Sequence, residues 1–312
     1  MIKNISPRIL LSGATILAAA ALAIGATFAF FSDTETSTDN TFVAGALDLK
    51  VDAEAHYAGL VCRDIVDDPN LGTVWIDDPA DPDPVTRPDL LGDACGGTWD
   101  ERDLTSEKFF DLTDIKPGDD GENTISLHVI NNDAWGRLVI ENDDDLDVDC
   151  TEPETESADP ECITNTPGEG ELQDNMLFQI WLDEGLTNGF QCSDGVEAAR
   201  CTDDPTEGDN ILQETEPILV TPGTLDVGGE TLPIWLGLAT WAGNACAGDG
   251  SSTSDCPGLT SDGHMVGSIT YYFGLGWELP DTTGNEVQSD SLVADLRFDV
   301  EQYRNNPTPF AP

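Results

Sequence analysis

The sequence predicts an all-β fold: a jelly-roll-like antiparallel β-sandwich with long, disulfide-braced loop insertions. Three observations predict it. Apolar and polar side chains alternate with a period of two in several stretches, and polar loops rich in Asp, Pro, Gly and Thr separate these stretches. Eight cysteines are also available for bridges. A period of two indicates half-buried strands, and no long helical period follows the N-terminal segment.

The first 29 residues are typical of an export signal that is cleaved after Ala29. Lys3 and Arg8 form a short positive start, and an uncharged apolar run follows them. A retained membrane anchor is the alternative, because residues 9–31 are long enough to span a bilayer. The many small residues of the apolar run, such as the alanines at 18–21, argue against a stable membrane span. We therefore expect a secreted protein of the extracellular cell surface that meets the membrane only through its signal segment.

Six stretches alternate and are expected to be strands of one sandwich domain that covers residues 41–312. Roughly eight to ten strands with Greek-key or jelly-roll connections fit this pattern. The apolar residues that share a face are, in chain order, Leu47, Leu49 and Val51; Ile125, Leu127 and Val129; Phe178, Ile180 and Leu182; Leu232, Ile234, Leu236 and Leu238; Ile269, Tyr271, Phe273, Leu275 and Trp277; Leu292, Ala294, Leu296, Phe298 and Val300.

Four polar insertions interrupt the strands, and each of them carries one pair of cysteines. They cover about residues 53–105, 143–175, 184–230 and 243–266. This distribution favours local bridges, each contributing about 3 kcal/mol by restricting the unfolded chain. Bridges between insertions stay open as the alternative, because eight cysteines allow about 105 connectivities. The expected pairs are Cys62 with Cys95, Cys150 with Cys162, Cys192 with Cys201, and Cys246 with Cys256.

The chain is strongly acidic, with a formal net charge of −49. Loss of Lys3 and Arg8 with the signal leaves 10 basic against 61 acidic residues, a charge of −51. Polyanionic partners such as nucleic acid and anionic lipid are therefore excluded. Two interpretations of the acidity stay open. One is adaptation to high salt, which the small number of lysines favours, and the other is divalent cation binding in acidic loops.

One acidic run alternates in the way a strand or an extended loop would, at Asp143, Asp145, Asp147 and Asp149. It has neither the spacing nor the glycine of an EF-hand loop. We expect these residues to form solvated acidic surface. A structural Ca²⁺ site at these four positions is the second interpretation, and no other cofactor is expected.

Residues for catalysis are scarce. The histidines are His56, His128 and His264, far apart in the sequence and outside any His-Glu-x-x-His element. His128 is expected to be solvated, on the face of its strand opposite Leu127 and Val129. The sequence has no Gly-x-Ser-x-Gly elbow and no phosphate-binding loop, and every cysteine has a plausible partner. We therefore expect that the protein is not an enzyme and has no catalytic residues.

Three stretches of the sequence together carry a family resemblance. The first is Phe30-Phe31-Ser32-Asp33-Thr34 with the Thr-Phe-Val-Ala-Gly-Ala-Leu-Asp-Leu that starts at Thr41. The second is Leu-Thr-Asp-Ile-Lys-Pro-Gly-Asp at 112–119, and the third lies within 277–305. They resemble the TasA/camelysin family of secreted fibre and biofilm matrix proteins. The third stretch is similar to the ending of archaeal and bacterial relatives, so together with the acidity the resemblance implies a halophilic archaeal member. The four cysteine-bearing insertions have no counterpart in the bacterial prototype.

The resemblance implies a jelly-roll subunit of extracellular fibres that are joined by strand donation. The partner is then a second copy of the chain, apart from a dedicated signal peptidase during export. Residues 30–40, which start with Phe30 and Phe31 and contain no proline or glycine, are the expected donor segment. Camelysin has been described as a metalloprotease, although no zinc-ligand pattern is present here.

Three functions are therefore carried forward. The leading hypothesis is a structural fibre subunit for biofilm matrix or adhesion. The second is a monomeric surface module that binds glycan or cation through the braced loops. The third is a secreted metalloprotease of the camelysin type.

Overall fold

The computed structural model describes residues 47–64, 72–78, 81, 84–157, 162–191, 204–224, 230–245 and 256–311. These residues belong to one compact unit, Gly45–Pro312. The expected signal peptide (1–29) and donor segment (30–40) lie outside the described residues, as do Cys192, Cys201 and Cys246.

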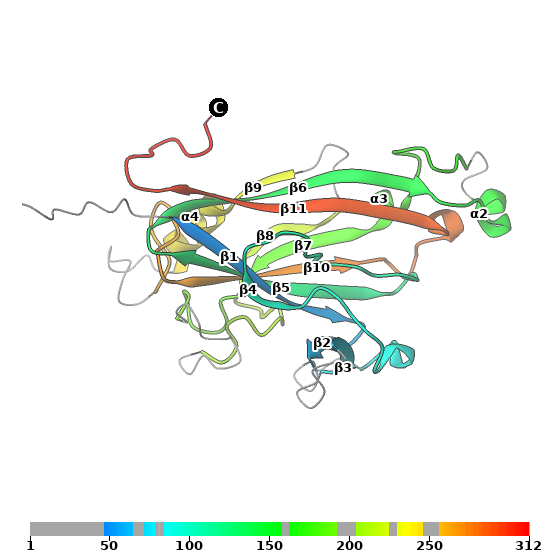
Figure 1. The fold of residues 1–312 in the computed structure, drawn as a ribbon, viewed down its shortest axis with the longest axis horizontal. Coiled ribbons are helices and arrows are strands. Elements are labelled where there is room, and N and C mark those ends of the chain that lie inside the picture. Colours follow the sequence, from blue (N-terminus) through cyan, green and yellow to red (C-terminus); the bar gives the residue numbers. More distant parts are fainter. Residues whose placement is uncertain are drawn as a thin grey trace, which may run out of the picture. The chain divides into compact units, whose positions relative to one another are not determined.

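Two antiparallel sheets face each other, which confirms the predicted all-β, sandwich-like fold (Figure 1). The larger sheet has the order β3-β2-β1-β5-β10-β7-β8, with β4 also paired to β1, and the smaller has the order β11-β6-β9. The larger sheet contains β1 (Asp48–Tyr57), β2 (Leu60–Asp64), β3 (Thr73–Asp77), β4 (Trp99–Arg102), β5 (Asp120–Ile130), β7 (Leu177–Leu182), β8 (Ile218–Gly223) and β10 (Thr270–Glu278). The smaller contains β6 (Ala134–Asp147), β9 (Glu230–Pro233) and β11 (Asp290–Gln302).

The main core lies between the two sheets. Ile125, Ile180 and Phe273 of the larger sheet pack in one cluster with Leu138 and Ile140 of the smaller. Ile125, Ile180 and Phe273 belong to the alternating stretches, whereas strand β6, which carries Leu138 and Ile140, was not among them. Burial of apolar side chains on facing sheets explains the layered arrangement. β10 lies between β5 and β7 in the larger sheet, and its side chains are buried along almost its whole length.

Helices are few and short among the residues that the structure describes. They are η1 (Pro88–Leu90), α2 (Glu152–Ser157), α3 (Leu172–Asn175), α4 (Ile234–Ala245) and η3 (Asn285–Val287). In the part of the chain that the structure describes, none of them is long and apolar enough to cross a membrane.

The strand expected at Leu232–Leu238 is wrong after Pro233, where α4 begins. Ile234, Leu238 and Ala242 are buried, whereas Leu236 is 57% exposed. The buried positions are four residues apart, which is the helical period. Positions 234 and 238 share a face in a strand as well as in a helix, so alternation over so short a run cannot distinguish the two.

The insertion at 53–105 is more ordered than a polar loop. It supplies β2, β3 and β4 and the second half of β1, and it has its own apolar cluster around Tyr57, Leu60 and Trp75. A disulfide joins Cys62, which lies on β2, to Cys95, and a second joins Cys150 to Cys162. Both are among the four local pairs that the sequence predicts.

Candidate functional site

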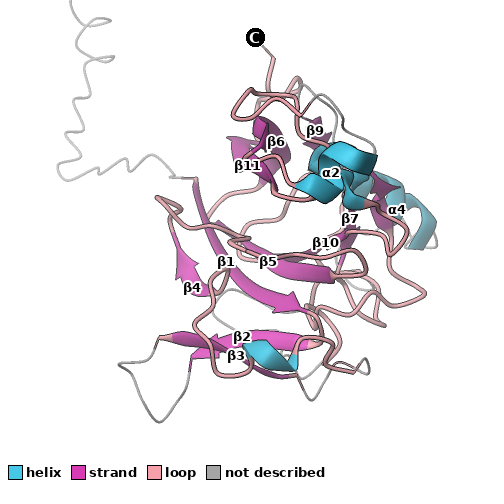
Figure 2. Cartoon of the chain, turned by 90° about the vertical axis from the view of Figure 1, so that its right-hand side faces the viewer, coloured by secondary structure: helices cyan, strands magenta, loops and turns pink. Residues whose placement is uncertain are grey.

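A groove runs between the edge strand of the smaller sheet, β11, and strand β1 of the larger. Its volume is about 680 Å³. Leu49 and Val51 line it from β1, and Leu296, Phe298 and Val300 line it from β11. Viewed along the sandwich, β11 lies at one border of its layer, above β1 and β4 (Figure 2). The sandwich is therefore open to solvent along this side, with apolar side chains on both walls.

One edge of β11 is unpaired in the described structure. β11 pairs with β6 along its whole length, from Asp290 opposite Asp147 to Gln302 opposite Ala134. No other described strand pairs with β11. An edge of this kind presents N–H and C=O groups that a further strand can pair with. Because the inward residues of β11 also line the groove, a strand added here would have both a backbone partner and an apolar surface.

Charged residues form the rim of the groove. Arg137 donates hydrogen bonds to Asp299 and lies 4.4 Å from the centre of the Phe310 ring. Arg297 contacts the same Asp299 at 3.2 Å. These contacts fix the C-terminal part of β11 and the chain that follows it.

A second site, a buried carboxylate cluster, lies at the opposite end of β6 and β11. It exists because of a β-bulge: Val293 is opposite Asp144, and Ala294 is opposite Asn142, so Asp143 is skipped in the pairing. One extra residue reverses which face the following side chains occupy. Asp145 is thereby opposite Leu292 and Asp147 opposite Asp290, and all four side chains point to the inner face.

The expectation that this run is solvated is therefore wrong for two of its members. Asp145 is 5% exposed and Asp147 is fully buried. Asp149 is exposed and accepts a hydrogen bond from the N–H of Cys150. The backbone of Asp143 lies in β6, but its side chain is outside the described structure. The four aspartates thus do not form one site.

Instead, Asp147 meets acids from elsewhere in the chain. Asp147, Glu171 and Asp290 each place a carboxylate oxygen within 4.8 Å of the others. Asp147 accepts a hydrogen bond from the N–H of Ile163, and Asp290 accepts one from the N–H of Glu171. Burial, followed by the neighbouring Asp147 carboxylate, raises the pKa of Asp290 to about 8. Burial likewise raises the pKa of Asp145 to about 6.

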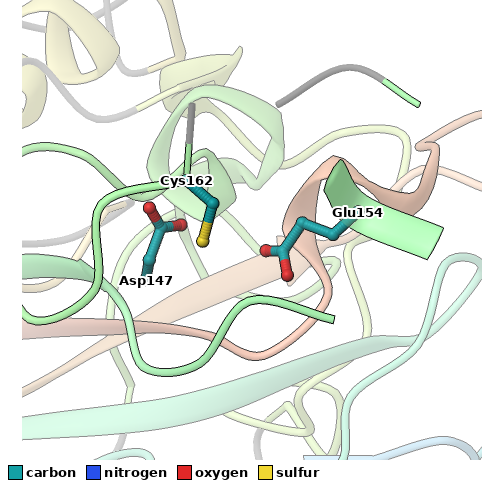
Figure 3. Close-up of side chains that lie close together, drawn as sticks. All are labelled: Asp147, Glu154 and Cys162. Atoms are coloured by element: carbon teal, nitrogen blue, oxygen red, sulfur yellow. The ribbon is translucent and has the colours of Figure 1, made fainter. Parts of the chain in front are cut away.

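Asp147 also belongs to a second group with Glu154 and Cys162 (Figure 3). The carboxylates of Asp147 and Glu154 are directed toward the region around the Cys162 sulfur. That sulfur is bonded to Cys150, so it cannot act as a thiolate ligand while the disulfide is intact. The group therefore offers oxygen ligands only.

The histidines do not assemble into a site. His56 contacts Asp78 at 3.1 Å, His128 contacts Asp52 at 3.0 Å, and His264 pairs with Asp262. His128 is 3% exposed, so the expected solvated histidine is wrong. Its strand, β5, is paired on both sides by β1 and β10, and neighbouring residues of those strands cover the face that carries His128.

Sequence reasoning missed a set of buried acids in the insertion at 184–230 and just before it. Each accepts a hydrogen bond from a backbone N–H of the same segment: Asp183 from Gly208 and Asn210, Glu184 from Gly189, Asp204 from Thr187, Glu207 from Gln191, and Glu216 from Gly185 and Gln213. Burial raises the pKa values of Asp183 and Glu216. In so acidic a sequence, nothing marks these five acids as buried.

The fold and groove define a β-sandwich with an open edge strand. Residues 6–58 match the family model described as camelysin metallo-endopeptidase. This match supports the resemblance to the TasA/camelysin family over the N-terminal part of the chain. No curated protein matches the chain.

The family description corrects one expectation. We expected that the protein is not an enzyme, whereas the matched family is described as a metallo-endopeptidase and points to an enzyme. Zinc in such enzymes is bound largely by histidine nitrogen, with an occasional carboxylate. Among the described residues, the groups that could hold a metal contain carboxylates and a disulfide-bonded cysteine, without histidine. These donors do not fit a zinc peptidase centre and are the ligands that hard cations prefer.

Proposed function

We propose that the protein is a structural subunit of extracellular cell-surface fibres and polymerises by donor-strand addition. Residues 30–40 of one copy would lie along β11 of the next. The observation that carries the proposal is the unpaired edge of β11 beside a groove of about 680 Å³ with apolar residues of β1 and β11 on its walls and charged residues at its rim. Strand addition at such an edge combines backbone hydrogen bonds with side-chain pockets.

The donor sequence suits this groove. Phe30 and Phe31 are followed by Ser32, Asp33 and Thr34, and the segment up to Asn40 contains neither proline nor glycine. Every residue can therefore donate a backbone hydrogen bond to the ladder. Burial of two phenylalanine side chains would contribute roughly 3–6 kcal/mol before the cost of ordering the segment. The leucines and valines that line the groove supply the apolar surface for these rings.

Donation of this kind leads to filaments. The donor segment and the acceptor groove are different surfaces of the same chain, so the contact is head-to-tail and leaves a free groove at one end. Further subunits can therefore add to the free end, and the polymer has no fixed length. Cell-surface adhesion or a biofilm matrix would be the biological setting of such a fibre, after export and cleavage behind Ala29.

Negative-stain microscopy of the native cell surface tests this proposal. Thin filaments labelled by an antibody against residues 47–312 are expected, and N-terminal sequencing of the extracted subunit should start at Phe30. Labelled surfaces without filaments would contradict the fibre and favour a monomeric binding module.

The family description favours a second candidate, a secreted metallo-endopeptidase. Casein hydrolysis that a chelator abolishes and added zinc restores would support it. If the protein hydrolyses no more casein than a heat-denatured control does, this candidate is contradicted.

A further inference from the structure

We infer that Asp147, Glu171 and Asp290 bind a divalent cation, calcium by the chemistry of the ligands. The site lies where the bulged end of β6 meets the start of β11. None of the three residues lines the groove, and this inference does not rest on the proposed fibre assembly.

The spacing of the oxygens fits the ion. One carboxylate oxygen from each of the three residues lies within 4.8 Å of the other two. A Ca²⁺ ion lies about 2.3–2.6 Å from its ligands, so oxygens on one ion are at most about 5 Å apart. The three oxygens can therefore share one ion without a change of fold, and water or backbone carbonyls would complete the shell.

Unsatisfied buried oxygens give independent support. Asp147 is fully buried, and its Oδ1 has no hydrogen-bond partner, whereas its Oδ2 accepts from the N–H of Ile163 at 3.0 Å. The Oδ1 of Asp290 likewise receives no hydrogen bond from an N–H or hydroxyl group, and its Oδ2 accepts from the N–H of Glu171 at 2.8 Å. The Asp290 side chain also lies against the Asp147 carboxyl group, so two acidic groups face each other here. Buried polar atoms nearly always have a partner. A cation between these oxygens would supply it.

The excess of negative charge at these residues also favours a bound cation. Asp147 and Asp290 are direct cross-strand partners, and like charges in this arrangement are destabilising. Among the ion pairs between described residues, none includes Asp145, Asp147 or Asp290. A divalent cation offsets the excess negative charge. A ligand set made only of oxygen selects calcium or a similar hard cation over zinc.

A bound ion would join three separate parts of the chain. Asp147 ends β6, Asp290 begins β11, and Glu171 immediately precedes α3. The ion would hold this end of the smaller sheet and the segment that covers it. Calcium should therefore stabilise the folded state.

The test is thermal unfolding of the secreted protein at pH 8 in 1 M NaCl, with either chelator or calcium chloride. In 1 M salt the nonspecific attraction of cations to the acidic surface is screened to about 3 Å. Calcium at about 100 times its dissociation constant should raise Tm by about 5 °C or more. Isothermal titration calorimetry should show saturable binding over the same range.

Asp290→Asn is the decisive variant, with Asp295→Asn as its matched control. Asp295 is exposed on the same strand and is also opposite an acid, Glu141. In chelator, Asp290→Asn should unfold at the same or a higher temperature than the native chain, because a repulsion is removed. In calcium it should show no rise, whereas the control keeps the full rise. An equal rise in Asp290→Asn, or no rise in the native chain, would overturn the site.

Discussion

The buried carboxylate of Glu184 accepts a hydrogen bond from the backbone N–H of Gly189 at a distance of 2.9 Å. Gly189 has a φ of +93°, and a Cβ there would lie 2.6 Å from the carbonyl oxygen of Pro257. A glycine is therefore required at this turn. The acid holds the turn in place, so a charged group inside the protein helps to shape a loop.

Replacing Glu184 by glutamine should stabilise the protein at pH 8 and leave it almost unchanged at pH 4. Burial raises the pKa of Glu184 to about 7, above its ordinary value of 4.5. The folded state therefore holds more protons than the unfolded state between these values, and stability falls as pH rises through them. The gain at pH 8 should be on the order of 2–3 kcal/mol. Urea unfolding at both pH values measures it.

Glu169→Gln is the control for this prediction, because Glu169 is exposed. It should change the free energy of unfolding by less than about 0.5 kcal/mol at either pH. Equal gains for the two variants would show that general charge reduction, not burial of Glu184, is responsible.

The melting temperature should rise steeply with sodium chloride. At a formal charge of −49, self-repulsion opposes compaction, and the screening length falls from about 30 Å at 0.01 M to about 3 Å at 1 M salt. Differential scanning calorimetry in chelator measures the rise without calcium. A flat profile from 0.1 to 2 M would contradict the salt-adapted interpretation of the acidity.

Loss of the Cys62–Cys95 bridge should destabilise the protein more than loss of Cys150–Cys162. Their sequence separations are 33 and 12 residues. Loop entropy predicts losses of about 4 and 3 kcal/mol, respectively. Cys62 is also fully buried in the cluster around Tyr57 and Trp75. Two variants, each with both cysteines of one bridge replaced by alanine, are compared by urea unfolding. A larger loss of stability in the Cys150–Cys162 variant would contradict the entropic account.

Val300→Asp should prevent filament formation, whereas Val293→Asp should not. Both residues lie on β11, but Val300 lines the groove, and Val293 is 51% exposed. A charge inside the groove opposes burial of the donor phenylalanines. Both variants should keep a cooperative unfolding transition, which separates a blocked groove from a failure to fold. Filaments of normal length from Val300→Asp would place the acceptor elsewhere.

Strands with long alternation could be predicted from the sequence. The stretch from Tyr271 to Trp277 and that from Leu292 to Val300 lie in β10 and β11 as expected. Their apolar faces are long enough to exclude a helix. The open edge of β11 could not be predicted, because pairing between distant strands depends on the whole topology.

The buried carboxylates escaped prediction for a different reason. The bulge at Asp143 changes the face of Asp145 and Asp147 by adding one unpaired residue. The alternation of side chains along the sequence continues through the bulge, so it cannot reveal that the inward face has changed. Glu171 and Asp290 come from distant segments, so only the folded chain brings them to Asp147.

The most direct test of the fibre model compares two chains by negative-stain microscopy and size-exclusion chromatography. A chain that starts at Phe30 should form filaments. A chain that starts at Thr41 keeps β11 and its groove and should remain a folded monomer. A peptide of residues 30–40 should bind this monomer, and a peptide with Phe30 and Phe31 replaced by serine should bind much more weakly. Filaments from the chain that starts at Thr41 would contradict donation by the N-terminal segment.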